Sequence, residues 1–328
     1  MSRLRAFVSL IAVLMLLAKP FEAAATEVWF APNDDLPRGP KHDRIPGPDF
    51  QHLFDPAPAW SMRADVFEIS PMMTMASDDK TKDKLRRISP FLAQHHIALA
   101  VGVGAALVDN ANPVPGECGF GVEGMGRPGR NTQYFQRLKQ LGIGIQYIVM
   151  DEPLTYAHYY SKKNACHYSI EDTARRVADA IAEIRHYYPN ARIVDEEAPS
   201  ITSAAQWNAD FAGWLKAYRQ AVGSSLDAVV FDVDWRQSWQ NWVVPSLTTA
   251  HNNRVRAGII LDGTGPGASD AEAIAAYKQN MQSVDDSRLP FDLVVVANWT
   301  PHPSRNLPES DPDTLASVLA WYNARHGR

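Results

Sequence analysis

Apolar runs that end directly in carboxylates are the feature of this sequence with the clearest chemical potential. The pattern occurs three times, in "VMDEP" (149–153), "IVDEEAP" (193–199) and "VVFDVDW" (229–235). In the first, Asp151 and Glu152 follow three apolar residues, and strand alternation does not decide which of the two faces inward. Two carboxylates held close together can serve as proton donor and as nucleophile or base. The pattern therefore predicts acid–base chemistry at one place in the fold.

Eight short β-rich apolar runs, separated by helical patterns, are the elements that must position these acids. They lie at 27–32, 64–70, 97–104, 145–152, 191–197, 226–234, 255–262 and 292–299. Several are continuously apolar, as strands are when a parallel sheet is buried on both faces. Eight alternating units in 328 residues predict an α/β fold, a single-domain (β/α)8 TIM barrel. The alternative is an open doubly wound sheet, but no G-x-G-x-x-G turn follows an early strand.

Strand alternation predicts which acids reach the interior of such a barrel, whose sites lie at the C-terminal strand ends. Asp232 and Asp234 share one face of their run, which we assign to the interior. In the preceding run, the same reasoning favours Glu197 over Glu196. Acids are also common in ordinary turns and helix starts. That ordinary interpretation is preferred for Asp35, Glu68 and Glu196.

Hydrolysis of a glycosidic bond needs a proton donor and a second carboxylate, and acids at neighbouring strand ends could supply both. A donor needs a raised pKa, which burial and neighbouring acids supply. Acids and aromatic residues in one cleft suit carbohydrate, because sugar rings stack on aromatic faces while acids and amides bind hydroxyl groups. The residues expected to bind substrate are Asp151, Asp232, Asp234, Trp235, Asn298, Trp299, His302 and Glu123.

The N-terminus has the pattern of a secretory signal peptide. A basic start precedes an apolar stretch (7–18) too short to span a bilayer, and "EAAAT" (22–26) allows cleavage after Ala25. We expect residues 1–25 to be removed and residues 26–328 to form the barrel domain of a secreted or periplasmic protein, free of the membrane after cleavage. An uncleaved anchor is the alternative. The formal net charge of −5 and the absence of a basic run argue against nucleic acid as a partner.

The two cysteines, Cys118 and Cys166, are expected to form a disulfide, because export permits oxidation. Cys118 lies in a loop rich in Gly and Pro (105–130) after the third predicted strand, and Cys166 lies after the fourth. A pinned loop at the mouth of the barrel would shape a substrate site. The segment 299–310 is a second candidate lid.

With "DEP" at 151–153 and Trp299 after the eighth run, the chain resembles glycoside hydrolases of the large retaining (β/α)8-barrel clan. In that clan the donor Glu ends strand 4, usually in Asn-Glu-Pro, the nucleophile Glu ends strand 7, and a Trp often ends strand 8. The resemblance implies the proton-donor role for Glu152. We expect Glu197 as its first-choice catalytic partner and Asp262 as its second. Here Asp151 replaces the Asn, and strand 7 ends in Asp262. The chain is also similar to secreted bacterial barrels with "MDEPL", "DVDW" and "PHP…LPE" segments.

The sequence thus predicts a secreted glycoside hydrolase or transglycosidase whose partner is an oligosaccharide or polysaccharide. No cofactor is expected, because no phosphate-binding glycine loop is present, and no G-x-S-x-G motif indicates a serine hydrolase. No metal ligands are assigned: His95 and His96 precede the third run, on the wrong side of the barrel for a zinc site. Two alternatives stay open: a non-catalytic carbohydrate-binding barrel, and a metal-assisted hydrolase with Ca²⁺ or Mg²⁺ on clustered acids.

Overall fold

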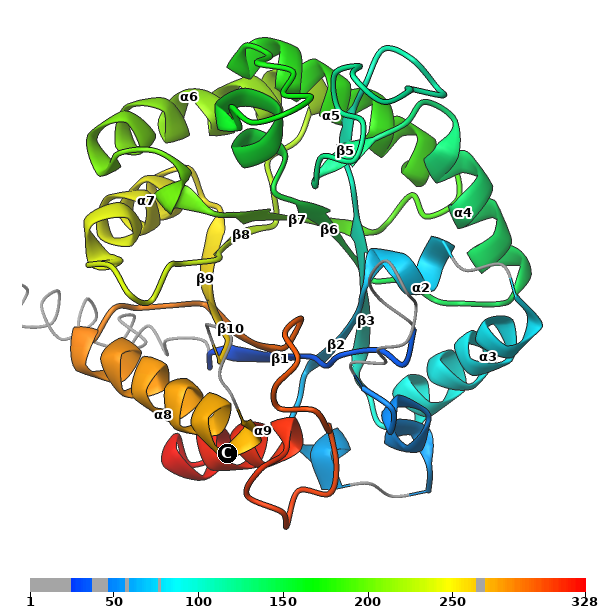
Figure 1. Cartoon of the computed structure of the whole chain (residues 1–328), viewed down its shortest axis with the longest axis vertical. Helices are drawn as coiled ribbons and strands as arrows, with labels where there is room; N and C mark the ends of the chain where they lie inside the picture. Colours follow the sequence, from blue (N-terminus) through cyan, green and yellow to red (C-terminus); the bar gives the residue numbers. More distant parts are fainter. Residues whose placement is uncertain (1–24, 37–46, 57–58, 76–77, 264–268) are drawn as a thin grey trace, which may run out of the picture.

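The computed structural model describes residues 25–36, 47–56, 59–75, 78–263 and 269–328. Eight parallel strands close into a barrel in the order β1-β2-β3-β6-β7-β8-β9-β10, and helices surround the ring in chain order (Figure 1). The predicted (β/α)8 barrel is therefore confirmed, and the open sheet is wrong. The predicted signal peptide, all but Ala25, lies outside the described residues, so its cleavage stays a prediction.

All eight barrel strands fall inside the apolar runs predicted for them. They are β1 (Glu27–Ala31), β2 (Val66–Ile69), β3 (Ala98–Val103), β6 (Tyr147–Asp151), β7 (Arg192–Glu197), β8 (Ala228–Phe231), β9 (Arg256–Leu261) and β10 (Leu293–Ala297). A separate short pair, β4 (Ala106–Leu107) and β5 (Met125–Gly126), lies within the long loop after β3.

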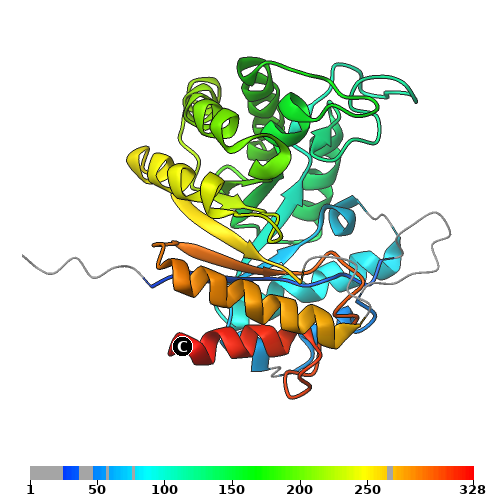
Figure 2. The same cartoon turned by 60° about the vertical axis from the view of Figure 1, so that its left-hand side comes forward.

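The helices alternate with these strands, and short turns complete the connections. The α-helices are α2 (Pro71–Met75), α3 (Asp79–Gln94), α4 (Arg130–Gln140), α5 (Ile170–Arg185), α6 (Ala204–Val222), α7 (Gln240–Asn252), α8 (Asp270–Ser287) and α9 (Leu315–Arg325). The short turns are η1 (Phe50–Phe54), η2 (Ala59–Met62), η3 (Thr155–Tyr159, a π-turn) and η4 (Pro199–Ile201). Figure 2 shows α8 and α9 side by side along the barrel wall. No helix in the described part of the chain is long and apolar enough to cross a membrane.

Hydroxyl side chains cap the N-termini of α5, α8 and α9. Ser169 and Ser269 each accept an N–H bond from the third residue of α5 and α8. Thr314 is the N-cap of α9, which begins at Leu315. Asp311 accepts the Asp313 N–H in a turn ahead of this helix.

The barrel is filled by a second core, distinct from the layer between strands and helices. This inner core consists of strand residues alone and draws on all eight strands: Trp29, Val66, Ala100, Tyr147, Val149, Val194, Ala228, Val230, Ile260, Leu293, Val295 and Ala297. The rings of Trp29 and Tyr147 lie 4.8 Å apart within it. Because this inner core fills the barrel, the next inward-facing residue of each strand lies at the C-terminal mouth of the barrel.

The Cys118–Cys166 disulfide is confirmed. It ties the long loop after β3 to the segment between η3 and α5. That segment follows β6, which is the neighbour of β3 in the barrel. Two hydrogen bonds from Asn164 reinforce the link: its carbonyl accepts the Gly119 N–H at 2.8 Å, and its Nδ2 donates to the Phe120 carbonyl at 2.8 Å. The loop is therefore held against the mouth of the barrel.

Candidate active site

A cavity of about 580 Å³ opens at the C-terminal ends of the strands, and we call it the acid cavity. All eight barrel strands, or the residues directly after them, contribute to its wall, together with α2, the long loop and η3. Its lining residues are Ala31, Pro32, Glu68, Ser70, Pro71, Met72, Met75, Gly102, Glu123, Val149, Asp151, Glu152, Tyr156, Glu196, Asp232, Ile260, Val295, Ala297, Asn298 and Trp299.

Four carboxylates reach this cavity by the same geometric route. Each lies two residues beyond a member of the inner core on the same strand, so each faces inward, directly above that core. They are Glu68 above Val66, Asp151 above Val149, Glu196 above Val194, and Asp232 above Val230. Asp151 and Glu196 are paired in register across β6 and β7, so their side chains are neighbours on the inner face.

Glu152 enters the cavity by a different route, through a bend in the backbone. Its φ is +47°, in the left-handed region that a non-glycine residue rarely adopts. The bend is held because the Glu152 N–H donates to the carbonyl of Glu196 at 3.0 Å. As a result, Asp151 and Glu152 both line the cavity although they are consecutive. Gly124 packs on this bend, and a Cβ on it would lie 2.3 Å from the Asp151 carbonyl oxygen.

Three of the acids form a tight group. One carboxylate oxygen from each of Glu152, Glu196 and Asp232 lies within 4.8 Å of the other two. The Glu152 side chain is 6% exposed, and its Oε2 has no hydrogen-bond partner among the described residues. Retaining glycosidases hold their two carboxyl groups about 5–5.5 Å apart. The group has the spacing for acid–base chemistry on a sugar, and also for holding a cation.

Burial and mutual repulsion keep these acids protonated above their usual range. Burial, then the charge of Asp232, raises the pKa of Glu152 to about 10. Burial, then Glu123, raises the pKa of Asp151 to about 7, and burial, then Asp151, raises the pKa of Glu68 to about 8. The same causes raise the pKa values of Glu196 and Asp232. Like charges in a low-dielectric site cannot all ionise together, so the cavity holds several protons at neutral pH.

The rim of the cavity combines a polar contact with exposed apolar groups. The Tyr156 hydroxyl donates to Glu123 Oε2 at 2.6 Å, and burial, then this bond, raises the Tyr156 pKa. Trp299 is 42% exposed at the end of β10, and Met72 and Met75 of α2 are also exposed. An exposed tryptophan beside polar groups is the pattern of a surface that binds a partly apolar, hydroxyl-bearing ligand.

Glu197 was predicted to be the catalytic partner in the cavity, and this prediction is wrong because its side chain does not line the cavity. The inward face of β7 carries Val194 and Glu196, so Glu197 points outward and is fully buried. Its carboxylate accepts bonds from Leu154 N at 2.7 Å, Thr155 N at 2.9 Å and Thr155 Oγ1 at 2.7 Å. Glu197 therefore holds the turn that starts η3 and does not line the acid cavity.

Asp262 and Asp234 also lie outside the wall of the acid cavity, for a shared reason. Both follow the last residue of a strand, since β9 ends at Leu261 and β8 at Phe231; Asp262 was predicted from its place at the end of a run, and Asp234 from alternation. Asp262 turns toward α8, where its carbonyl accepts a bond from Asn280. Asp234 pairs with Arg236 at 2.8 Å, which lowers its pKa.

The remaining predicted binding residues divide between cavity and loop. Trp299 lines the cavity, as does Asn298, whose amide atoms bond to the following loop. Trp235 lies outside the cavity wall and packs edge-on against Trp239 at 5.7 Å. His302 also lies outside it, because its Nδ1 is hydrogen-bonded to Asp270 at the start of α8.

Two acids dismissed from the sequence as ordinary, Glu68 and Glu196, line the cavity, and Tyr156 was not considered. In β7 both Ile193 and Val194 are apolar, so the sequence pattern did not reveal which of them faced the barrel interior. Asp35 was correctly interpreted as ordinary, since it forms an ion pair with Lys84 away from the cavity.

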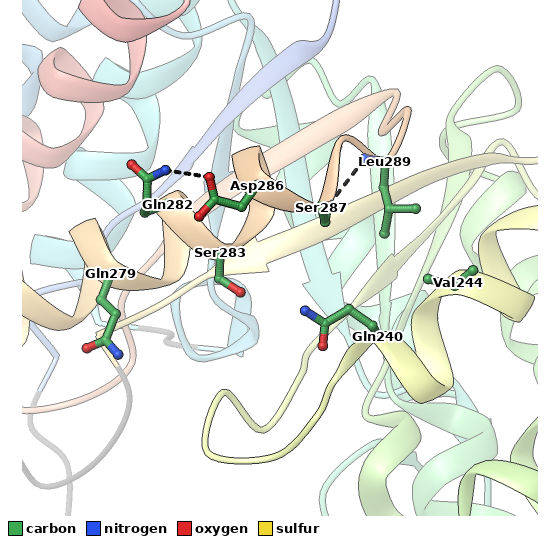
Figure 3. Close-up of a pocket in the computed structure, with 8 residues that line it drawn as sticks. All are labelled: Gln240, Val244, Gln279, Gln282, Ser283, Asp286, Ser287 and Leu289. Carbon is green, nitrogen blue, oxygen red and sulfur yellow. Dashed lines mark hydrogen bonds between the residues drawn. The ribbon is translucent and has the colours of Figure 1, made fainter.

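A second hollow, of about 550 Å³, lies on the outer wall between α7 and α8, and Figure 3 shows it in close-up. Amide and hydroxyl side chains dominate its lining, and Gln282 donates to Asp286 at 2.7 Å within it. None of the strand-end carboxylates lines this groove. The chemistry therefore concentrates at the mouth of the barrel.

No family model matches this chain, and the comparison with curated proteins gives no match. Among solved structures, a GH5_18 protein from Streptomyces cattleya in complex with Manb1-4GlcNAc aligns with a TM-score of 0.52 at 9% identity, over 91% of this chain and 81% of its own. HydG, a maturase of the FeFe hydrogenase, gives 0.44 at 8% identity, and this chain aligns over 83% of its length but spans only 57% of HydG. PhdJ bound to a substrate intermediate gives 0.42 at 12% identity, over 92% and 72%. The GH5_18 alignment shows a shared barrel fold and nothing about activity.

Proposed function

We propose that this protein is a glycoside hydrolase or transglycosidase in which Glu152 donates the proton and Asp232 is the partner carboxylate. The observation that carries the proposal is the approach of Glu152, Glu196 and Asp232 to within 4.8 Å at the mouth of the barrel. This spacing suits a retaining mechanism, in which one acid protonates the leaving oxygen and the other attacks the sugar.

The surroundings of the two acids support this division of roles. Glu152 is enclosed and its pKa is raised to about 10, so it holds the proton that the leaving group needs. Asp232 is less enclosed than Glu152 and faces the cavity, so we assign it the role of the attacking carboxylate. Asp232 forms a bond to the anomeric carbon as the bond to the leaving oxygen breaks, and that oxygen takes the Glu152 proton. Water, or a sugar hydroxyl in a transglycosidase, then displaces Asp232, with Glu152 as base.

The substrate class follows from the rim and from a fold-level parallel. Trp299 presents an exposed face on which a sugar ring can stack, and Asp151, Glu123 and Glu196 offer groups for its hydroxyls. A barrel of the same fold holds a disaccharide in the GH5_18 structure. The disulfide, together with the predicted signal peptide, supports action outside the cytoplasm, on an oligosaccharide or polysaccharide.

Turnover on a panel of polysaccharides, measured as release of reducing ends, tests the proposal. We expect Glu152→Gln and Asp232→Asn to lower kcat by about 10²-fold or more, while substrate affinity stays within about threefold. Glu171→Gln, a matched change on the exposed face of α5, should leave turnover intact. Glycan binding without turnover by the native protein would replace the proposal with a non-catalytic carbohydrate-binding barrel.

A metal-assisted hydrolase is the second candidate, because the same three oxygens are close enough to hold one cation. Carboxylate oxygens are the ligands that Mg²⁺ and Ca²⁺ prefer, and Glu152 Oε2 has no other partner among the described residues. A cation there would keep Glu152 ionised, so Glu152 could not donate a proton. Treatment with EDTA, followed by titration with Mg²⁺ or Ca²⁺, separates the candidates: only the second loses and regains activity.

A further inference from the structure

A smaller hollow of about 180 Å³ adjoins the acid cavity, and we call it the side cavity. The two hollows share Pro71, Met75 and Gly102 as wall residues, so they lie side by side. Apart from glycines and apolar residues, the lining of the side cavity consists of Arg127, Arg130, Asn131 and Tyr134. This wall contains two arginines and no acid, the opposite of its neighbour.

The polar groups of the side cavity are hydrogen-bond donors without an acidic partner. Among the described residues, neither Arg127 nor Arg130 forms an ion pair, and the Arg130 guanidinium stacks on the Tyr134 ring at 5.6 Å. Asn131 is 5% exposed, and its Nδ2 has no hydrogen-bond partner within the described part of the chain. A buried donor left unpaired is costly, which indicates that a ligand acceptor completes it.

The backbone at the start of α4 does not provide this site. Glu183 of α5 already accepts the N–H of Gly129 at 2.8 Å and that of Thr132 at 3.2 Å. The free donors are therefore the side chains of Arg127, Arg130 and Asn131, which project from the loop and the first turn.

Glycines and the disulfide fix the shape of the side cavity. A Cβ on Gly126 would lie 2.4 Å from the Gly104 carbonyl oxygen, so these two backbones can approach only without side chains. Gly119 has a φ of +78°, and a Cβ there would lie 3.6 Å from Cys166 Sγ. The Cys118–Cys166 disulfide thus holds the wall that carries these glycines, and the hollow stays narrow.

We propose that the side cavity binds an anionic group, a carboxylate or a sulfate, on the sugar unit next to the one held in the acid cavity. A guanidinium presents paired donors that match the oxygens of either group. The lining of the acid cavity offers carboxyl groups and no basic side chain to such a group, so the position of the anionic group fixes which sugar unit lies at Glu152. This inference deepens the proposed function by naming its substrate class, an acidic glycan.

Equilibrium binding, measured without reference to turnover, tests this assignment. The probes are oligosaccharides in matched pairs: uronic acid oligomers with their carboxyl-reduced forms, and sulfated oligomers with their desulfated forms. We expect one anionic probe to bind at least about tenfold tighter than its neutral partner. Arg127→Gln and Arg130→Gln should each remove about tenfold from the anionic probe and leave the neutral one unchanged. Arg219→Gln, the same charge change on the exposed face of α6, should change neither.

The pair of probes that shows the preference distinguishes a carboxylate from a sulfate. Equal binding of anionic and neutral probes, or an anionic preference that survives both arginine variants, would overturn the assignment. Because the measurement is of binding, a protein that discriminates between the probes without cleaving them refutes the proposed function and retains the side cavity. A protein that cleaves only neutral glycans would retain the proposed function and refute the anion site in the side cavity.

Discussion

Replacing Glu152 with glutamine should make the stability of this protein less dependent on pH. The pKa of Glu152 is raised from 4.5 to about 10 in the folded chain, mainly by burial. Below pH 4.5 the carboxyl is protonated in both states and contributes no pH dependence. Above it, the unfolded chain ionises while the folded chain keeps its proton, so the free energy of unfolding falls as pH rises toward 10.

The free energy of unfolding of the native protein falls by about 1.36 kcal/mol for each pH unit above 4.5, the pKa of the carboxyl in the unfolded chain. At pH 7 the native carboxyl lowers the free energy of unfolding by about 3 kcal/mol, and at pH 5 by less than about 1 kcal/mol. Glutamine has a similar shape and no charge to lose. As pH rises from 4.5 to 7, the free energy of unfolding of the variant should therefore increase by about 3 kcal/mol relative to that of the native protein.

Urea unfolding of the two proteins at pH 4.5, 5.5 and 7 measures this gain, and the difference between them cancels any constant effect of the amide. Glu171→Gln on the surface of α5 is the matched control and should show no trend. A constant difference across the three pH values would mean that Glu152 is ionised in the folded protein. It could not then be the proton donor, and the reasoning from its burial would be refuted.

Three further predictions concern the residues that hold the site in place. Glu197→Gln should destabilise the fold by about 1–3 kcal/mol, measured by urea unfolding, because the amide NH₂ would face buried donors at the start of η3. Gly124→Ala should abolish most turnover while circular dichroism stays native-like, because its Cβ would displace the bend at Asp151. Serine at both Cys118 and Cys166 should cost about 4 kcal/mol in unfolding free energy, the chain-entropy value for the loop that they close, and should weaken glycan binding.

The strands were predictable from sequence because each is a short apolar run of the length that a buried parallel strand needs. The site was harder, since it depends on where alternation starts and stops. Asp232 follows a run in which polar and apolar faces are distinct, and its inward position follows directly. At β7 both faces are apolar below the acids, so only packing in the closed barrel reveals that Glu196 faces in and Glu197 out.

Spacing does not reliably place the acids beyond the strand ends. Asp232, one residue past β8, keeps the alternation and lines the cavity, whereas Asp262, one residue past β9, and Asp234, three past β8, do not line it. Glu152 shows the converse, because its left-handed backbone brings it back into the cavity beside Asp151. Such a bend depends on contacts from Glu196 and Gly124, far away in the sequence, and no local pattern encodes it.

The origin of the oxygen in the product tests the central claim most directly. The native protein is incubated in ¹⁸O-labelled water with a glycan that it cleaves, and the product is analysed by mass spectrometry. We predict one ¹⁸O atom on the anomeric carbon of each new reducing end, or an unlabelled transfer product where a sugar hydroxyl is the acceptor, and neither product from Glu152→Gln. A product without ¹⁸O, in which the bond has broken by elimination, or no cleavage of any glycan, would contradict hydrolysis by the carboxylates of the acid cavity.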